Sequence, residues 1–176
     1  MLQDDFGRFW FCTDNGLSVF DGQNFRRVTD TSYSVIMLGG RQDPKGNLWF
    51  FTLDSEILLL EKGSDEPKLV FSSEQIRKYF RDHIISYLRF IEGKLVITTG
   101  VELLFISDYE SSDPGFEYLD ASRSYITCFC DGADCIAVSR LKKEGSMDLV
   151  LIENNDTSTY DNLPLFDKSG KYWLRS

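Results

Sequence analysis

Residues 4–10 read DDFGRFW, residues 43–49 read DPKGNLW and residues 167–173 read DKSGKYW. The three segments align without gaps as Asp-x-x-Gly-x-apolar-Trp, and the three tryptophans of the chain all occupy the last position. Chance alone would rarely place every tryptophan in one slot, so the motif marks an internal repeat. A repeat of this kind indicates the fold class more strongly than the local hydropathy pattern of any single segment.

Two weaker copies lie between the second and third segments. Residues 91–99 read IEGKLVITT and place Val96 in the tryptophan position, and residues 130–138 read CDGADCIAV with a shift of one residue. The five glycines stand at 7, 46, 93, 132 and 170, so successive copies are 39, 47, 39 and 38 residues apart. A period of about 40 residues in a β-rich chain is typical of the four-stranded blades of a β-propeller.

The residues around each motif predict one blade. The aspartate bonds its own backbone in a tight turn, and the glycine supplies a positive φ. The segments 9–13 (FWFCT) and 48–52 (LWFFT) are apolar on both faces, which predicts strands buried between neighbouring blades. Further strands are predicted at 17–20, 25–28, 56–61 and 68–71, with preceding strands at 33–38, 84–91 and 125–130.

We therefore predict an all-β propeller segment over residues 1–176, with about four blades of four-stranded antiparallel sheet. The repeats run near 4–42, 43–90, 91–129 and 130–166, with a final strand at 167–176. The longer second interval holds an insertion, in which Ser72 and Gln75 have the spacing of a capping box. Apolar residues then recur at helical spacing, which predicts a short helix over 73–83. Its apolar stripe is expected to pack on the blades, and a partner-binding helix is the alternative.

Residues 4–22 (DDFGRFWFCTDNGLSVFDG) resemble the two-component regulator propeller repeat, through Asp4, Gly7, Trp10 and the run from Thr13 to Gly22. The second copy resembles it through Thr52 and then departs, because residues 53–56 replace the Asn-Gly-Leu turn. The third and fourth copies lack the tryptophan. The resemblance implies a propeller in the periplasmic sensor region of a bacterial hybrid histidine kinase, where many members sense oligosaccharides. The repeat motif is structural, so the resemblance assigns no ligand-binding residues.

The expected function is a non-catalytic sensor segment that binds a carbohydrate, such as an oligosaccharide, or another extracellular ligand. It is expected to work with the rest of a larger sensor protein. A structural or protein-interaction propeller is one alternative, and a propeller-fold glycosidase or lyase fragment is another. A slice of a longer propeller would be periplasmic, and its open blade edges would favour self-association. A closed four-bladed ring or a pair of copies are the alternatives, and a complete chain would be cytoplasmic.

The net charge and the hydropathy of the chain argue against two classes of partner, nucleic acids and membranes. The net charge is −9 and the sequence pI is about 4.6. Such a chain repels phosphate backbones and anionic lipid, so nucleic acid and membrane surfaces are not expected partners. No apolar run is long enough to span a membrane, and the acidic N-terminus is unlike a signal peptide.

The reactive side chains form no catalytic or metal-binding set, so we expect no catalytic residue, metal or cofactor. His83 is the one histidine, and its place in the predicted helix favours a packing role. Cys128, Cys130 and Cys135 form a small cluster that lacks a fourth zinc ligand. We interpret these cysteines as buried free thiols, with a Cys130–Cys135 disulfide in an oxidising compartment as the alternative.

Acidic and aromatic residues have structural interpretations as well. The acidic pairs fall at turns, where carboxylates usually bond the backbone; they are Asp4 with Asp5, Asp131 with Asp134, and Glu153 with Asp156. Four aromatic residues lie in or near predicted loops, namely Tyr109, Phe116, Tyr118 and Tyr160. We expect them to cover blade edges, with stacking on sugar rings as the alternative. The acceptor sequon at 155–157 matters only in a glycosylating secretory pathway.

Overall fold

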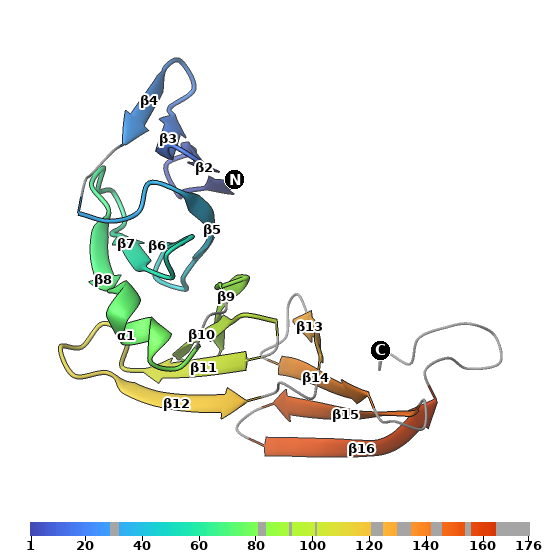
Figure 1. The fold of residues 1–176 in the computed structure, drawn as a ribbon. Helices are drawn as coiled ribbons and strands as arrows, with labels where there is room; N and C mark the ends of the chain where they lie inside the picture. Colours follow the sequence, from blue (N-terminus) through green and yellow to red (C-terminus); the bar gives the residue numbers. More distant parts are fainter. Residues whose placement is uncertain are drawn as a thin grey trace. The chain divides into compact units, whose positions relative to one another are not determined.

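The computed structural model describes residues 1–28, 32–80, 84–91, 93–100, 102–120, 125–129, 135–141, 146–153 and 156–164, with side chains up to Tyr118. In these ranges the strands form four antiparallel four-stranded sheets, and the helical content is a single short helix (Figure 1). The predicted all-β architecture is therefore confirmed. Residue contacts divide the chain into two compact units, Met1–Thr99 with Leu103–Tyr118, and Gly100–Glu102 with Leu119–Ser176. No described helix is long and apolar enough to cross a membrane.

The first sheet is a meander in which each strand pairs with the next one along the chain. Its strands are β1 (Leu2–Gln3), β2 (Phe9–Thr13), β3 (Gly16–Phe20) and β4 (Phe25–Val28). The turn from β2 to β3 places Gly16 at a φ of 99°, where glycine has no side chain to clash. The Thr13 hydroxyl closes this turn, because it donates to the Gly16 carbonyl at 2.7 Å and accepts from the Asn15 amide at 3.1 Å.

The second sheet contains β5 (Met37–Gln42), β6 (Leu48–Thr52), β7 (Ile57–Leu60) and β8 (Lys68–Phe71). The prediction of its first strand at 33–38 is wrong, because β5 begins only at Met37. Two glycines in β5 allow its backbone to lie close to β6. A Cβ atom at Gly39 would lie 2.8 Å from the Phe51 ring, and one at Gly40 would lie 2.4 Å from the carbonyl oxygen of Trp49. The segment that pairs with the aromatic strand β6 must therefore lack side chains at these positions.

The third and fourth sheets have the same meander order. The third contains β9 (Tyr87–Ile91), β10 (Lys94–Thr98), β11 (Glu102–Ser107) and β12 (Gly115–Asp120). The fourth contains β13 (Tyr125–Phe129), β14 (Cys135–Leu141), β15 (Ser146–Glu153) and β16 (Asp156–Pro164). Each sheet begins with the strand before its turn, whereas the sequence repeats were counted from the turn itself. The sheets therefore start one strand earlier than the repeat windows.

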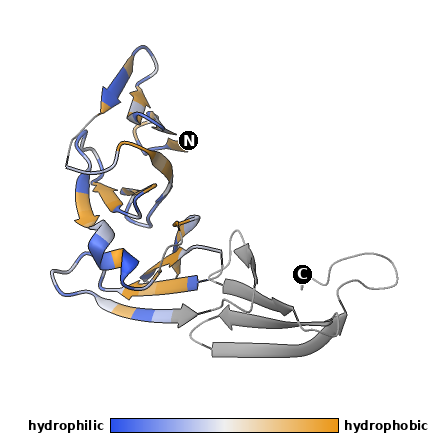
Figure 2. Cartoon of the chain, in the orientation of Figure 1, coloured by the Kyte–Doolittle hydropathy of each residue, from blue (hydrophilic) through white to orange (hydrophobic). Residues whose placement is uncertain are grey.

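The core of the first unit consists of two apolar clusters, one on each side of the second sheet. Side chains along β6 alternate, so Leu48 and Phe50 enter one cluster while Trp49 and Phe51 enter the other. The first cluster also contains Trp10, Leu17 and Val19 from the first sheet, and the second contains Leu95, Ile97, Leu104 and Ile106 from the third. Figure 2 shows the hydrophobic character of β7 and β11 within these sheets. The expectation that residues 48–52 form a strand covered on both faces is confirmed.

The insertion forms α1 (Ser73–Arg77), which is shorter than the helix predicted over 73–83. The predicted capping box is present, because the Ser72 hydroxyl accepts from the Gln75 amide and the Gln75 side chain accepts from the Ser72 amide. The helix then ends in a turn in which the Ile76 carbonyl accepts from the amides of Tyr79 and Phe80. Ile76 and Phe80 are buried in the cluster between the second and third sheets, as expected for the apolar stripe.

Replacing Ser72 by alanine is expected to lower the free energy of unfolding by about 1 kcal/mol, because the variant loses the N-cap hydrogen bond. Ser73→Ala is the matched control, since Ser73 is the first helical residue and plays no part in the capping box. Urea unfolding followed by circular dichroism measures both. Equal stability of the two variants would mean that the capping box contributes nothing.

Candidate functional site

The first motif folds around the carboxylate of Asp4. One oxygen, Oδ1, accepts from the backbone amides of Phe6 and Arg8 at 3.0 and 2.9 Å. The other, Oδ2, accepts from the Arg8 Nε at 2.7 Å and from the indole Nε1 of Trp10 at 3.0 Å. Gly7 has a φ of 80° at the bend of this turn. The first and last residues of the motif are therefore joined by a hydrogen bond between their side chains.

The second motif repeats this arrangement around Asp43. Its Oδ1 accepts from the amides of Lys45 and Asn47 at 2.9 and 2.8 Å. Its Oδ2 accepts from the Asn47 Nδ2 at 2.9 Å and from the indole Nε1 of Trp49 at 3.0 Å. The backbone bonds were predicted from the sequence, but the bond to the indole was not, although the shared spacing of aspartate and tryptophan was its signal. The last copy with a tryptophan, residues 167–173, lies outside the described residues.

These contacts hold the Asp4 carboxylate within its own turn. Burial acts to raise its pKa, but hydrogen bonds from Trp10, Arg8 and Phe6 outweigh burial, and the pKa lies below its ordinary value. A carboxylate held ionised in this way is a poor general acid. The neighbouring Asp5 also has a lowered pKa, through hydrogen bonds from Lys62 and then Gln42.

Each motif turn also contacts the following sheet through charged side chains. Asp5 pairs with Lys62 at 2.5 Å, and the Arg8 guanidinium pairs with Asp65, both partners lying in the turn between β7 and β8. The second motif makes the equivalent contact, because Lys45 pairs with Glu110 in the turn between β11 and β12. These exposed pairs favour the register between neighbouring sheets, and each contributes little to stability.

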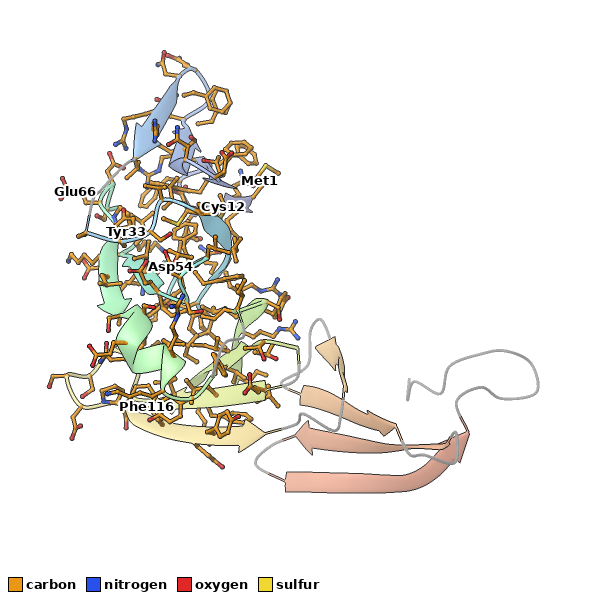
Figure 3. All side chains as sticks on the ribbon, in the orientation of Figure 1. Met1, Cys12, Tyr33, Asp54, Glu66 and Phe116 are labelled. Atoms are coloured by element: carbon orange, nitrogen blue, oxygen red, sulfur yellow. The ribbon has the colours of Figure 1, made fainter. Side chains whose placement is uncertain are left out.

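Two of the aromatic residues placed in or near loops lie on a strand instead. Phe116, labelled in Figure 3, and Tyr118 belong to β12, and both pack against Tyr79 with ring centroids 5.4 and 6.2 Å apart. Tyr109 is buried against Trp49 at 5.3 Å between centroids. Burial, followed by the negative charges of Asp43 and Glu110, raises the pKa of Tyr109. Tyr109 lies in the core cluster, and Phe116 and Tyr118 pack against it, whereas all three were expected at blade edges. The side chain of Tyr160 lies outside the described residues.

Most of the remaining histidine, cysteine, acidic and sequon residues singled out from the sequence lie outside the part of the chain whose side chains the structure describes. His83, Cys130, Asp131, Asp134 and Asn155 lie outside the described residues, as do the side chains of Cys128, Cys135, Glu153 and Asp156. Cys12, labelled in Figure 3, packs against the first cluster, and burial raises the pKa of its thiol to about 11. A thiol with that pKa is protonated at neutral pH and is a weak nucleophile. Among the described residues, no group of three or more metal-ligating side chains converges.

Sequence reasoning missed the most distinctive surface of the first unit, the outer face of the first sheet. Strand β2 was expected to be covered on both faces, but Phe9 and Phe11 point away from the clusters and are only half-buried. Phe20 and Phe25 lie on the same face and stack with centroids 4.6 Å apart, and Phe25 is 70% exposed. We call this surface, formed by Phe9, Phe11, Phe20 and Phe25, the outer aromatic face.

Comparison with known proteins identifies the fold. No protein-family profile matches the chain, and no curated protein matches it. Several solved structures do match, and the two described below are β-propellers. The chain has a β-propeller fold.

The two similar structures share little sequence with this chain. YCF48 from Cyanidioschyzon merolae is 17% identical with a TM-score of 0.52, and the match covers 88% of this chain and 56% of that chain. A streptogramin B lyase structure is 13% identical with a TM-score of 0.55, and the match covers 96% of this chain and 72% of that chain. The chain thus spans little more than half the length of the YCF48 chain. At these identities the likeness is one of fold alone.

Proposed function

We propose that this propeller is a non-catalytic input segment of a bacterial two-component sensor, and that it binds an oligosaccharide. The proposal rests mainly on the resemblance of residues 4–22 to the two-component regulator propeller repeat. The folded first motif is consistent with that resemblance, because Asp4, Gly7 and Trp10 form one hydrogen-bonded turn. In such a sensor the segment would be periplasmic and joined to the rest of a larger signalling protein.

Structural use of the reactive side chains supports a non-catalytic role. The carboxylates of Asp4 and Asp43 accept four hydrogen bonds each within their own turns. A carboxylate engaged in this way offers no free oxygen to a substrate. The streptogramin B lyase match does not favour an enzyme, since 13% identity carries the fold and not the active site.

An interaction propeller without a small-molecule ligand is the second candidate. The outer aromatic face favours it, because a group of half-buried phenylalanines with an exposed Phe25 is typical of a surface that another protein covers. The two candidate functions predict different stabilising partners. Binding of a sugar would stabilise a sensor segment, whereas binding of a protein would stabilise an interaction propeller.

Calorimetric titration of the chain with neutral and acidic oligosaccharides of several linkages tests the proposal. We expect one linkage class to bind with a dissociation constant of about 1 µM to 1 mM and to raise the melting temperature. The monosaccharides of that class are the control, and mass spectrometry of the recovered sugar checks that it is intact. Cleavage of the sugar would indicate a glycosidase or lyase, and absence of binding to every class would favour the interaction propeller.

A further inference from the structure

The outer aromatic face occupies positions that are buried in the next sheet. A shift of 39 residues relates the first two motifs and aligns Phe9 with Leu48 and Phe11 with Phe50. Phe20 pairs with Phe9 as Leu60 pairs with Leu48. Leu48, Phe50 and Leu60 are 1, 0 and 2% exposed, and all three lie in the cluster shared with the first sheet.

The third sheet follows the same rule. A shift of 47 residues from the second motif aligns Leu95 with Leu48 and Ile97 with Phe50, and Ile106 pairs with Leu95 as Leu60 pairs with Leu48. All three are fully buried in the cluster shared with the second sheet. The face that stays open in the first sheet is therefore the face that both following sheets bury.

The covering surfaces of the two interfaces share one feature. Each belongs to the preceding sheet and carries the tryptophan of the motif. Trp10 lies over the second sheet with its ring 6.4 Å from that of Phe50, and Trp49 shares a cluster with Leu95 and Ile97. Each interface thus pairs the tryptophan face of one blade with the positions of Phe9, Phe11 and Phe20 in the next.

Charge on the outer aromatic face also suits burial. Strand alternation places Thr13, Ser18 and Arg27 beside the four phenylalanines, and none of these is acidic. The chain as a whole has 28 acidic residues, so a sheet face without a carboxylate stands out. The Arg27 guanidinium bonds the Asn15 carbonyl at 2.7 Å, which draws it towards the rim of the face. Covering the face would therefore bury little unpaired charge.

We propose that the outer aromatic face is the docking site for one further blade of this repeat class, joined to the first sheet as the first is joined to the second. The incoming blade presents its tryptophan face, and its tryptophan packs over Phe11 as Trp10 packs over Phe50. The interface is made of sheet packed on sheet, as are the two interfaces inside the first unit. The proposal does not depend on the sugar ligand of the proposed function, and its test needs no ligand.

The test extends the full chain with a copy of its own residues 1–39, which repeats the spacing between the first two motifs. The control is the same extension with Trp10→Ser in the added copy only. Hydrogen exchange of the β2 and β3 amides in the original first sheet is the main measurement. We expect exchange about tenfold slower in the extended chain than in the chain alone, with the control close to the chain alone. Equal exchange in the extension and its control would overturn the proposal, including the case in which the added copy stays unfolded.

A second measurement uses the chain without any extension. If the face is open, Phe25→Asp should lower the fluorescence of a bound hydrophobic dye by about twofold. Leu69→Asp is the control, because Leu69 is 39% exposed on a different sheet. A second copy of the chain is the competing occupant. A concentration-dependent dimer in sedimentation analysis that Phe25→Asp abolishes would overturn the proposal in favour of that copy, and equal dye binding by both variants would overturn it as well.

Discussion

Replacing Trp49 by alanine is expected to lower the free energy of unfolding by about 3–5 kcal/mol, the largest effect of any substitution proposed for this chain. Trp49 is 0% exposed and lies between the second and third sheets. Its ring contacts Phe90 and Tyr109, with centroids 5.8 and 5.3 Å away. Alanine would leave a cavity at this interface and would also remove the indole donor from Asp43. Urea unfolding followed by far-ultraviolet circular dichroism measures the loss.

Two further variants separate packing from hydrogen bonding. Trp49→Phe keeps an aromatic ring between Phe90 and Tyr109 but cannot donate to Asp43, so a smaller loss of about 1–2 kcal/mol is expected. Phe25→Ala is the surface control, because Phe25 is 70% exposed and its removal should cost well under 1 kcal/mol. A loss below about 1 kcal/mol for Trp49→Ala would mean that the sheet interface does not depend on the tryptophan position.

The repeated motif made most of the fold predictable, because its chemistry is local. Aspartate, glycine and tryptophan lie within seven residues of each other, and the turn they form fixes where the next strand begins. The apolar run at 48–52 was correctly interpreted as a strand with two covered faces. The spacing of the glycines then predicted the number of four-stranded sheets in the described residues.

The local sequence pattern was less informative for strands whose bounds depend on pairing with a neighbouring strand. Strand β1 has only two residues, which is too short for any alternation to show. Strand β5 contains Gly39 and Gly40, which weaken a strand signal although contact with β6 requires them. The extended run expected at 33–38 was therefore placed too early.

The candidate surface was missed for a related reason. The runs at 9–13 and 48–52 have almost the same apolar pattern, yet only the second is covered on both faces. Whether Phe9 and Phe11 are buried depends on what lies beside the first sheet, and that information is not in the residues of the strand. A sequence pattern identifies surfaces that suit burial, whereas the fold decides which of them are covered.

Replacing Asp43 by alanine is expected to lower the free energy of unfolding by about 2–4 kcal/mol, because the donors of its turn would lose their acceptor. Asp43 is 5% exposed, so water replaces the carboxylate poorly. The Trp49 indole and the Lys45 and Asn47 amides would be left without this partner. Asp54→Ala is the control, since its carboxylate is exposed and forms one long ion pair with Arg77 at 3.4 Å.

Replacing Asp43 by asparagine separates the contributions of the two carboxylate oxygens, Oδ1 and Oδ2. Its carbonyl oxygen can still accept from the Lys45 and Asn47 amides, but its NH₂ group would face the indole N–H and the Asn47 Nδ2, which are both donors. Asp43→Asn should therefore lie between the wild type and Asp43→Ala in stability. A double-mutant cycle with Trp49→Phe should give a coupling energy of about 1 kcal/mol, the contribution of the bond between the two side chains. Coupling near zero would mean that aspartate and tryptophan recur at this spacing for separate reasons, the turn and the core, and not as one unit.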